Sequence, residues 1–212
     1  IFDSKKVDKN VLKLVSKTPY KPDLRDLYYL YQFIFNNKRT TVMEFGSGWS
    51  SLIISMALTD LKKKYKISHL RRGNPFELFI IENEKKYLNI TKKRVETYRK
   101  KNFINIKINY LLTKAKMTNY QGNISSEYDK LPMCNPDFIY LDGPDQFKIQ
   151  GKINNLNIGH LDFVPMSCDI LKIENFLLPG TMILVDGRKS NARFLKNFFK
   201  RNWKYIENVF KD

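Results

Sequence analysis

Acidic residues recur in this sequence where short apolar runs end and turns begin. The run from Val42 to Phe45 contains one carboxylate and leads into Gly46-Ser47-Gly48, and three later apolar runs close on an Asp or Glu. The four acids are Glu44, Glu82, Asp142 and Asp186. The carboxyl ends of parallel strands line the ligand crevice of an open sheet. The pattern therefore predicts four carboxylates along one rim of a sheet that binds a ligand there.

The stretch from Val42 to Leu58 predicts a strand, a glycine turn and a helix. Gly46 and Gly48 permit a tight turn that brings backbone N–H groups close to a ligand. Glu44 precedes the first glycine by two residues, and its charge would repel a dinucleotide phosphate but attract an ammonium or sulfonium group. The turn also reads G-S-G-W-S-S rather than G-x-G-x-x-G. A positively charged ligand is thus favoured over a nicotinamide dinucleotide.

The segment Glu44-Phe45-Gly46-Ser47-Gly48, continued by Trp49-Ser50-Ser51-Leu52, resembles the E/D-x-G-x-G motif of class I S-adenosylmethionine-dependent methyltransferases. In that family the glycine turn receives the methionine end of the cofactor, and an acid that closes the second strand accepts hydrogen bonds from the ribose. The resemblance implies that S-adenosyl-L-methionine is bound by Glu44, Phe45, Gly46, Ser47, Gly48, Ser50, Glu82 and Asp142. Glu84 is the reserve ribose acceptor, although a carboxylate that favours a helix N-terminus is its simpler interpretation.

Residues 136–144, which read P-D-F-I-Y-L-D-G-P, resemble the fourth-strand motif of small-molecule O-methyltransferases, in which the terminal acid faces the transferred methyl group. Asp142 is therefore a candidate for the base that takes the acceptor's proton, together with His160 and Asp186. Catechol O-methyltransferase-like enzymes hold a divalent metal with acids at the ends of strands four and five, positions that Asp142 and Asp186 match. Gly187 stands where those enzymes place an asparagine ligand, so the sequence leaves a divalent metal ion open.

The spacing of apolar residues predicts the elements that position these side chains. Helices are predicted over residues 24–35, 52–61, 87–98, 170–177 and 194–199. Strands are predicted over residues 42–45, 78–82, 104–112, 136–142, 181–186 and 203–210, with the third at an edge. This alternation predicts a doubly wound α/β fold with a mainly parallel, Rossmann-like sheet and helices on both faces. The given sequence ends before the seventh, antiparallel strand that is usual in the resembled family, so that strand is expected to be either absent or removed.

Two segments interrupt the alternation of strands and helices. Residues 62–72 are rich in Lys and Arg and are predicted to form an inserted basic loop. Residues 145–165, which carry His160 and Asp162, show little periodicity. A loop of that length within a compact domain is usually a lid or a binding loop, so this segment is predicted to be the substrate loop.

The length of 212 residues and the lack of a Pro-, Gly- or Ser-rich linker predict one domain, with an N-terminal helical segment at 1–40 and a cofactor-binding domain at 41–212. No run reaches the roughly 18 apolar residues needed to span a bilayer. Cys134 and Cys168 are too few for a disulfide framework or a four-thiolate zinc site, which predicts a reducing, cytoplasmic location. Because the sequence starts at Ile1 rather than at a methionine, it does not decide whether a signal peptide precedes it.

Lys and Arg number 38 against 21 Asp and Glu, which gives a formal net charge of +17. The basic residues cluster at 62–72, 92–101 and 188–201, and this predicts an anionic acceptor such as an acidic sugar, a sugar nucleotide or a nucleic acid. A solvated basic face explains the same charge equally well.

The expected function is that of an S-adenosylmethionine-dependent methyltransferase acting on a small-molecule or saccharide acceptor. Transfer to oxygen is favoured because the fourth-strand motif lacks an Asn-Pro-Pro-Tyr type of amide and aromatic pair. A nucleic-acid (RNA) methyltransferase or an RNA-binding protein on the same fold is the alternative. A nicotinamide-dependent dehydrogenase is a weaker one.

Overall fold

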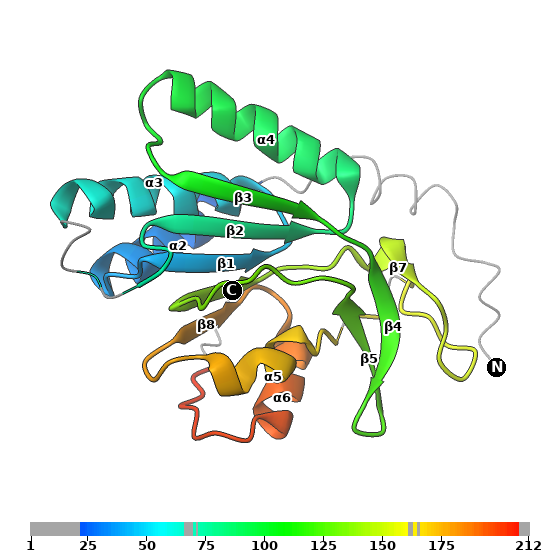
Figure 1. Cartoon of the computed structure of the whole chain (residues 1–212). Coiled ribbons are helices and arrows are strands. Elements are labelled where there is room, and N and C mark those ends of the chain that lie inside the picture. Colours follow the sequence, from blue (N-terminus) through cyan, green and yellow to red (C-terminus); the bar gives the residue numbers. More distant parts are fainter. Residues whose placement is uncertain (1–21, 66–69, 71, 161–162, 165, 208–212) are drawn as a thin grey trace.

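A computed structural model describes residues 22–65, 70, 72–160, 163–164 and 166–207 of the chain. Its main sheet contains five parallel strands in the order β3-β2-β1-β6-β8 (Figure 1). These strands are β1 (Thr41–Phe45), β2 (Glu77–Glu82), β3 (Lys107–Leu112), β6 (Phe138–Leu141) and β8 (Met182–Val185). The chain moves outward from β1 to β3 and then returns to the other side of β1, so the strand order reverses between β1 and β6.

Helices cover both faces of this sheet (Figure 1). One face carries α2 (Leu24–Asn36), α3 (Trp49–Lys64) and α4 (Lys85–Lys100), and the other carries α5 (Asp169–Ile173) and α6 (Lys189–Phe198). Side chains alternate between the two faces of a strand. Val42 accordingly packs with the first group of helices, while Met43 and Phe45 pack with the second. The predicted doubly wound, Rossmann-like α/β fold is confirmed.

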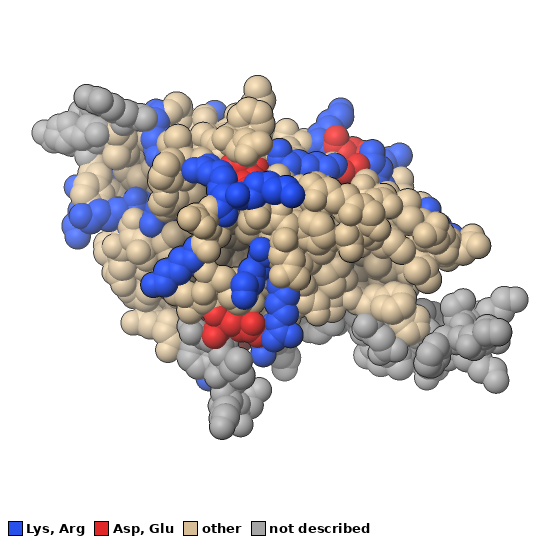
Figure 2. Space-filling model, turned by 90° about the horizontal axis from the view of Figure 1, so that it is seen from below, with Lys and Arg blue, Asp and Glu red and all other residues tan. Residues whose placement is uncertain are grey.

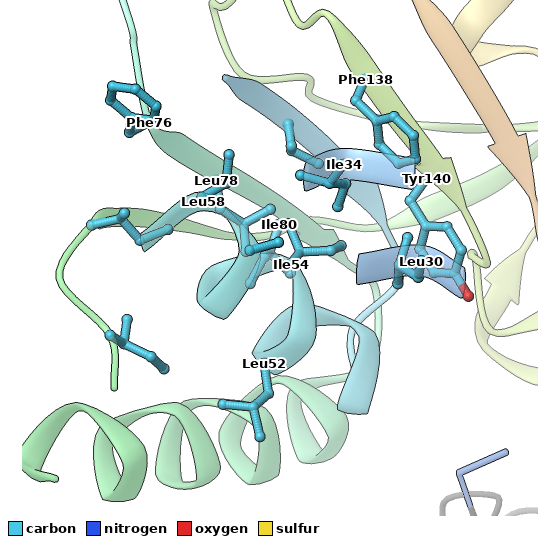
Figure 3. Close-up of a cluster of buried hydrophobic side chains, with 14 of the residues drawn as sticks. Leu30, Ile34, Leu52, Ile54, Leu58, Phe76, Leu78, Ile80, Phe138 and Tyr140 are labelled. Atoms are coloured by element: carbon cyan, nitrogen blue, oxygen red, sulfur yellow. The ribbon is translucent and has the colours of Figure 1, made fainter. Parts of the chain in front are cut away.

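The core between the sheet and the first group of helices includes the N-terminal helix. Figure 3 shows Leu30 and Ile34 of α2 close to side chains of α3 and of the sheet, and these residues belong to one buried cluster. Asp23 caps α2, because its carboxylate accepts hydrogen bonds from the backbone N–H groups of Arg25 and Asp26 at 2.8 and 3.4 Å. The α2 helix therefore shares its core with the rest of the fold.

A second, three-stranded sheet contains β4 (Ala115–Tyr120), β5 (Asn123–Tyr128) and β7 (Ile149–Gln150). The strands β4 and β5 form an antiparallel hairpin, and β7 pairs with β4 in parallel. No strand is predicted from the sequence between residues 113 and 135, and residues 145–165 are predicted to be a loop, so this sheet is missed. The hairpin turn, Gln121-Gly122, has positive φ angles of 50° and 86°. Asn-Gly is the usual sequence for such a turn, so Gln121 gives no sequence signal for the hairpin.

The predicted strand at residues 203–210 is not formed in its described part, which runs to Glu207. Glu174, in the short 3-10 helix η4 (Glu174–Phe176), is the reason. Its carboxylate accepts hydrogen bonds from the backbone N–H groups of Lys200 and Arg201 and from the Trp203 indole. The chain after α6 is therefore tied to the α5–β8 connection rather than to a neighbouring strand, and the prediction is wrong for residues 203–207.

The basic segment at residues 62–72 begins inside α3, whose last turn contains Lys62, Lys63 and Lys64. Arg72, at the end of the segment, has its side chain 3.5 Å from the carboxylate of Asp137. Asp137 also accepts hydrogen bonds from the backbone N–H groups of Thr40 and Thr41. These residues mark the starts of β1 and β6, so the described part of the basic segment lies at the amino ends of the strands.

Candidate functional site

Four neighbouring strands of the main sheet end in one row, which we call the carboxyl edge. Continuing the strand registers by one residue aligns Glu82, Gly46, Asp142 and Asp186 in that order across β2, β1, β6 and β8. Backbone hydrogen bonds hold the row: Gly46 N–H donates to the Ile81 carbonyl at 2.8 Å, Asp142 N–H to Phe45 at 2.9 Å and Asp186 N–H to Leu141 at 3.1 Å. The sequence-predicted residues thus meet at the point where the strand order reverses, which is where such sheets bind ligands.

The glycine turn after β1 packs tightly on the turn after β6. Gly46 has a φ of 99°, in the region that favours glycine, and a Cβ on it would lie 3.1 Å from the backbone carbon of Asp142. A Cβ on Gly143 would lie 2.6 Å from the Gly46 nitrogen. Ser47, Gly48 and Trp49 are only partly buried, and α3 begins at Trp49. The turn therefore exposes backbone at a helix N-terminus, next to Asp142.

Glu44 is fully enclosed beneath this turn. Its Oε1 accepts a hydrogen bond from the Ser50 hydroxyl at 2.5 Å, and its Oε2 has no hydrogen-bond partner among the described residues. Burial raises the pKa of Glu44 to about 8, although the hydrogen bond from Ser50 lowers it. Because none of its surface is accessible, Glu44 supports the turn through Ser50, and the direct contact with a cationic group expected from the sequence is not available in this arrangement.

Glu82 closes β2 with a carboxylate that is 2% exposed and already hydrogen-bonded. Its Oε1 accepts from the backbone N–H groups of Asn83 and Glu84 at 2.8 and 2.9 Å, and its Oε2 accepts from the Ser47 hydroxyl at 2.7 Å. Burial raises the pKa of Glu82 to about 7, and these hydrogen bonds oppose the rise. Glu84 caps α4 by accepting from Lys86 N–H at 3.0 Å, in agreement with its interpretation as a helix N-terminal acid.

Asp142 is held at the carboxyl edge by Arg188, a residue that the sequence analysis places only in a basic cluster. The Arg188 guanidinium donates to the Asp142 carbonyl at 2.6 Å, and its Nε lies 3.7 Å from the Asp142 carboxylate. Surrounding protein atoms raise the pKa of Asp142, while Arg188 lowers it. Since 48% of the Asp142 side chain is accessible to solvent, water limits that rise.

Asp186 accepts a hydrogen bond of 2.5 Å from the Tyr140 hydroxyl. Tyr140 lies on β6 and is another residue that the sequence analysis assigns only to a buried strand. The sequence contains one feature that could have identified Tyr140 as a site residue. It lies two residues before Asp142, and that spacing puts the two side chains on the same face of the strand. Asp142 and Asp186 are neighbours in the row, and each is fixed by a different partner.

His160 makes its described contacts within its own loop. Its ring lies against Phe163, with 5.2 Å between the ring centroids, and its carbonyl accepts from the Gln146 side chain at 2.8 Å. Asp162 lies outside the described residues. The role of His160 as a candidate base stays a prediction.

Tyr128 is a buried residue at this site that the sequence analysis misses, because it belongs to the unpredicted hairpin. Its ring packs on Phe45 at 5.8 Å between centroids, and its hydroxyl lies 2.5 Å from the position of a Cβ on Gly143. Within the described part of the chain that hydroxyl has no hydrogen-bond partner. The small sheet thus supports the turn that carries Asp142.

Exposed basic residues form a stripe along α6. Figure 2 views the side of α5 and α6 and shows Lys and Arg spread over this face with few acids among them. The stripe is made by Lys189, Arg193 and Lys196, which are exposed and spaced for one side of the helix, and exposed Lys200 lies just beyond the end of α6. Arg193 pairs with Glu207 at 2.8 Å, and Lys196 lies over the Tyr205 ring at 4.7 Å.

Within the described ranges, no three His, Cys, Asp or Glu side chains are arranged to hold a metal ion. None of the helices described has the length and apolarity to cross a membrane. No family model and no curated protein matches the sequence.

Among solved structures, the fold is similar to that of a candidate caffeoyl-CoA O-methyltransferase from Staphylococcus aureus, with 18% identity and a TM-score of 0.32. The match covers 62% of this chain and 50% of that protein, so the chain spans about half of its length. At this level of similarity the comparison supports neither a family nor an activity.

Proposed function

We propose that this protein is an S-adenosylmethionine-dependent methyltransferase that transfers a methyl group to an oxygen of a small-molecule or saccharide acceptor. The observation that carries the proposal is the row at the carboxyl edge. It joins an exposed glycine turn at a helix N-terminus with Glu82 on one side and Asp142 on the other. The resemblance of the glycine motif to that of the class I methyltransferases supports the same reading.

The residues present fit this cofactor. Gly46 and Gly48 add no side chain to the turn, and a Cβ on Gly48 would meet only the Ser50 hydroxyl, at 3.8 Å. The turn and the N-terminus of α3 would hold the methionine end, and Glu82 would accept hydrogen bonds from the ribose. When bound, S-adenosylmethionine supplies a methyl group already activated on a sulfonium. The protein then has to align the acceptor and take up its proton, for which Asp142 is the proposed base.

The acceptor is proposed to react through a neutral hydroxyl. The acids Asp142, Asp145 and Asp186 stand at the carboxyl edge, while the described part of the basic segment at 62–72 lies at the opposite edge. The residues of this segment that the structure describes do not flank the crevice, so they give the expected anionic acceptor no support. Arg188 is engaged by the Asp142 and Pro144 carbonyls. The basic stripe on α6 is the feature that supports the RNA-binding alternative. That alternative predicts RNA binding that weakens steeply as the salt concentration rises.

Calorimetric titration with S-adenosylhomocysteine tests the cofactor assignment. The wild-type protein is expected to bind it, whereas Gly46→Val should not, because valine is strained at a φ of 99° and its Cβ would press on Asp142. Glu82→Ala should weaken binding by about 1–3 kcal/mol, since it removes a buried acceptor. Tight binding of NADH without binding of S-adenosylhomocysteine would replace the proposal with the dehydrogenase alternative.

Replacing Asp142 by asparagine tests the proposed base. Asp142→Asn keeps the size and hydrogen-bonding geometry of the side chain but removes its basicity. Methyl transfer is expected to fall by roughly a hundredfold or more, with the affinity for S-adenosylhomocysteine unchanged. Transfer of labelled methyl groups to a panel of hydroxylated small molecules and saccharides provides the measurement. An unchanged rate would assign Asp142 to the turn alone and move the search to His160.

A further inference from the structure

The carboxylate of Glu82 has room for only one more hydrogen bond. A carboxylate offers about four lone-pair sites on its two oxygens. Asn83 N–H and Glu84 N–H occupy Oε1, and the Ser47 hydroxyl occupies one site of Oε2. A ribose presents two neighbouring hydroxyls, and both can donate only if a further site is freed. The two backbone N–H groups are fixed by the start of α4, so Ser47 is the partner that can leave.

The Ser47 hydroxyl can move away from Glu82 at little cost. It lies between two glycines on the turn and is only partly buried, and rotation about its χ1 carries the hydroxyl away from Glu82 without moving the backbone. The Glu82 side chain beneath it is almost completely covered. Ser47 therefore occupies the place through which a ligand hydroxyl would reach the carboxylate.

We propose that Ser47 is an internal competitor for the ribose: its hydroxyl satisfies Glu82 in the free protein and is displaced when a ligand with a vicinal diol binds. This inference rests on the proposed function, because it takes Glu82 as the ribose acceptor. Ser47 then contributes to ligand specificity. A ligand must first replace the hydrogen bond from Ser47 to Glu82, so its binding free energy improves only by what its own hydroxyls provide in addition.

Removing the serine hydroxyl has opposite effects on the free and the bound protein. In the free protein, Ser47→Ala leaves a buried carboxylate oxygen without its donor, which lowers stability. In the complex, the ligand diol supplies the missing donor and meets no competitor. The variant is therefore expected to have a lower melting temperature than the wild type and yet to bind ribose-containing ligands roughly three- to tenfold more tightly.

Calorimetry at about pH 8, where the Glu82 carboxylate is mostly ionised, measures the affinity. The probes are S-adenosylhomocysteine, 5′-methylthioadenosine and the 3′-deoxy form of 5′-methylthioadenosine. The first two carry a vicinal diol and should bind Ser47→Ala more tightly than the wild type. The 3′-deoxy probe donates only one hydrogen bond to the carboxylate, so Ser47→Ala should raise its affinity by less than it raises that of the two diols.

Ser55→Ala is the matched control. The Ser55 hydroxyl is buried and donates to the Ser51 carbonyl at 2.6 Å inside α3, so its loss should lower the melting temperature without raising any of the three affinities. Equal or weaker binding of the diols by Ser47→Ala would overturn the role of Ser47 and leave the proposed function standing. Failure of the wild type to bind any of the three probes would refute the proposed function and this inference with it.

Discussion

Gly143→Ala is expected to destabilise the protein by about 3 kcal/mol or more and to abolish binding of S-adenosylhomocysteine. The added Cβ would lie 2.6 Å from the Gly46 nitrogen and 2.8 Å from the Phe45 carbonyl carbon, both of them backbone atoms of β1 and its turn. Its third neighbour is the Tyr128 hydroxyl at 2.5 Å. Backbone atoms cannot rotate away as a flexible side chain can, so the turns after β1 and β6 must separate. That separation disrupts the carboxyl edge at its centre.

Urea unfolding and calorimetric titration measure the two effects of Gly143→Ala. The matched control is Gly73→Ala, because a Cβ there has no heavy atom within 4 Å and its stability should change by less than about 0.5 kcal/mol. Adding Tyr128→Phe to Gly143→Ala removes the closest side-chain atom and should recover only part of the loss, since the two backbone contacts remain. A normal unfolding midpoint for Gly143→Ala would show that the two turns are not in close contact.

Glu174→Ala is expected to destabilise the protein by about 2–3 kcal/mol. The Glu174 carboxylate is 2% exposed and accepts from Lys200 N–H at 2.9 Å, from Arg201 N–H at 2.8 Å and from the Trp203 indole at 2.9 Å. Alanine leaves these three donors unpartnered and frees the segment after α6. Urea unfolding gives the free-energy difference, and Glu174→Gln, which keeps one acceptor oxygen, should fall between the variant and the wild type.

The contribution of Glu174 should depend on pH in a defined direction. Burial tends to raise the pKa of Glu174, but the hydrogen bonds from Lys200, Arg201 and Trp203 hold it below its ordinary value of 4.5. The stabilisation is therefore fully present above the unfolded-state pKa and is lost as the pH falls through the lower folded-state pKa. The difference in unfolding free energy between wild type and Glu174→Ala should shrink below about pH 4.5. A difference that stays constant in acid would contradict this role for the carboxylate.

The elements of the main sheet were predictable because their signals are local. Val42, Leu78 and Phe138 belong to short apolar runs that each end in an acid or a glycine, and such runs are typical of buried parallel strands. Helical spacing after each run then requires the alternating topology. The edge position of β3 also followed from sequence, because Ile104 to Tyr110 alternates apolar and polar residues.

The elements that were missed or wrongly predicted depend on distant partners. The strands β4 and β5 are stabilised by packing of Met117 and Tyr128 against the main sheet, and their own sequence is polar and weakly periodic. The segment after α6 has the apolar alternation of a strand but is captured by Glu174, about 26 residues earlier in the sequence. The pattern of apolar residues along a short segment cannot reveal the packing of β4 and β5 or the hydrogen bonds of Glu174, because both form only when distant parts of the chain fold together.

The sequence by itself determined the order of the strands of the main sheet and of the helices between them, and it put Glu44, Glu82, Asp142 and Asp186 in or at the ends of apolar runs. It did so because hydrophobic periodicity and glycine turns act over a few residues. Only the tertiary structure decided what those acids contact: Glu44 is sealed beneath the turn, Glu82 is covered by Ser47 and Asp142 is held by Arg188. Those contacts join residues 35 or more positions apart in two of the three cases, and they exist only once parallel strands align their carboxyl ends in one row.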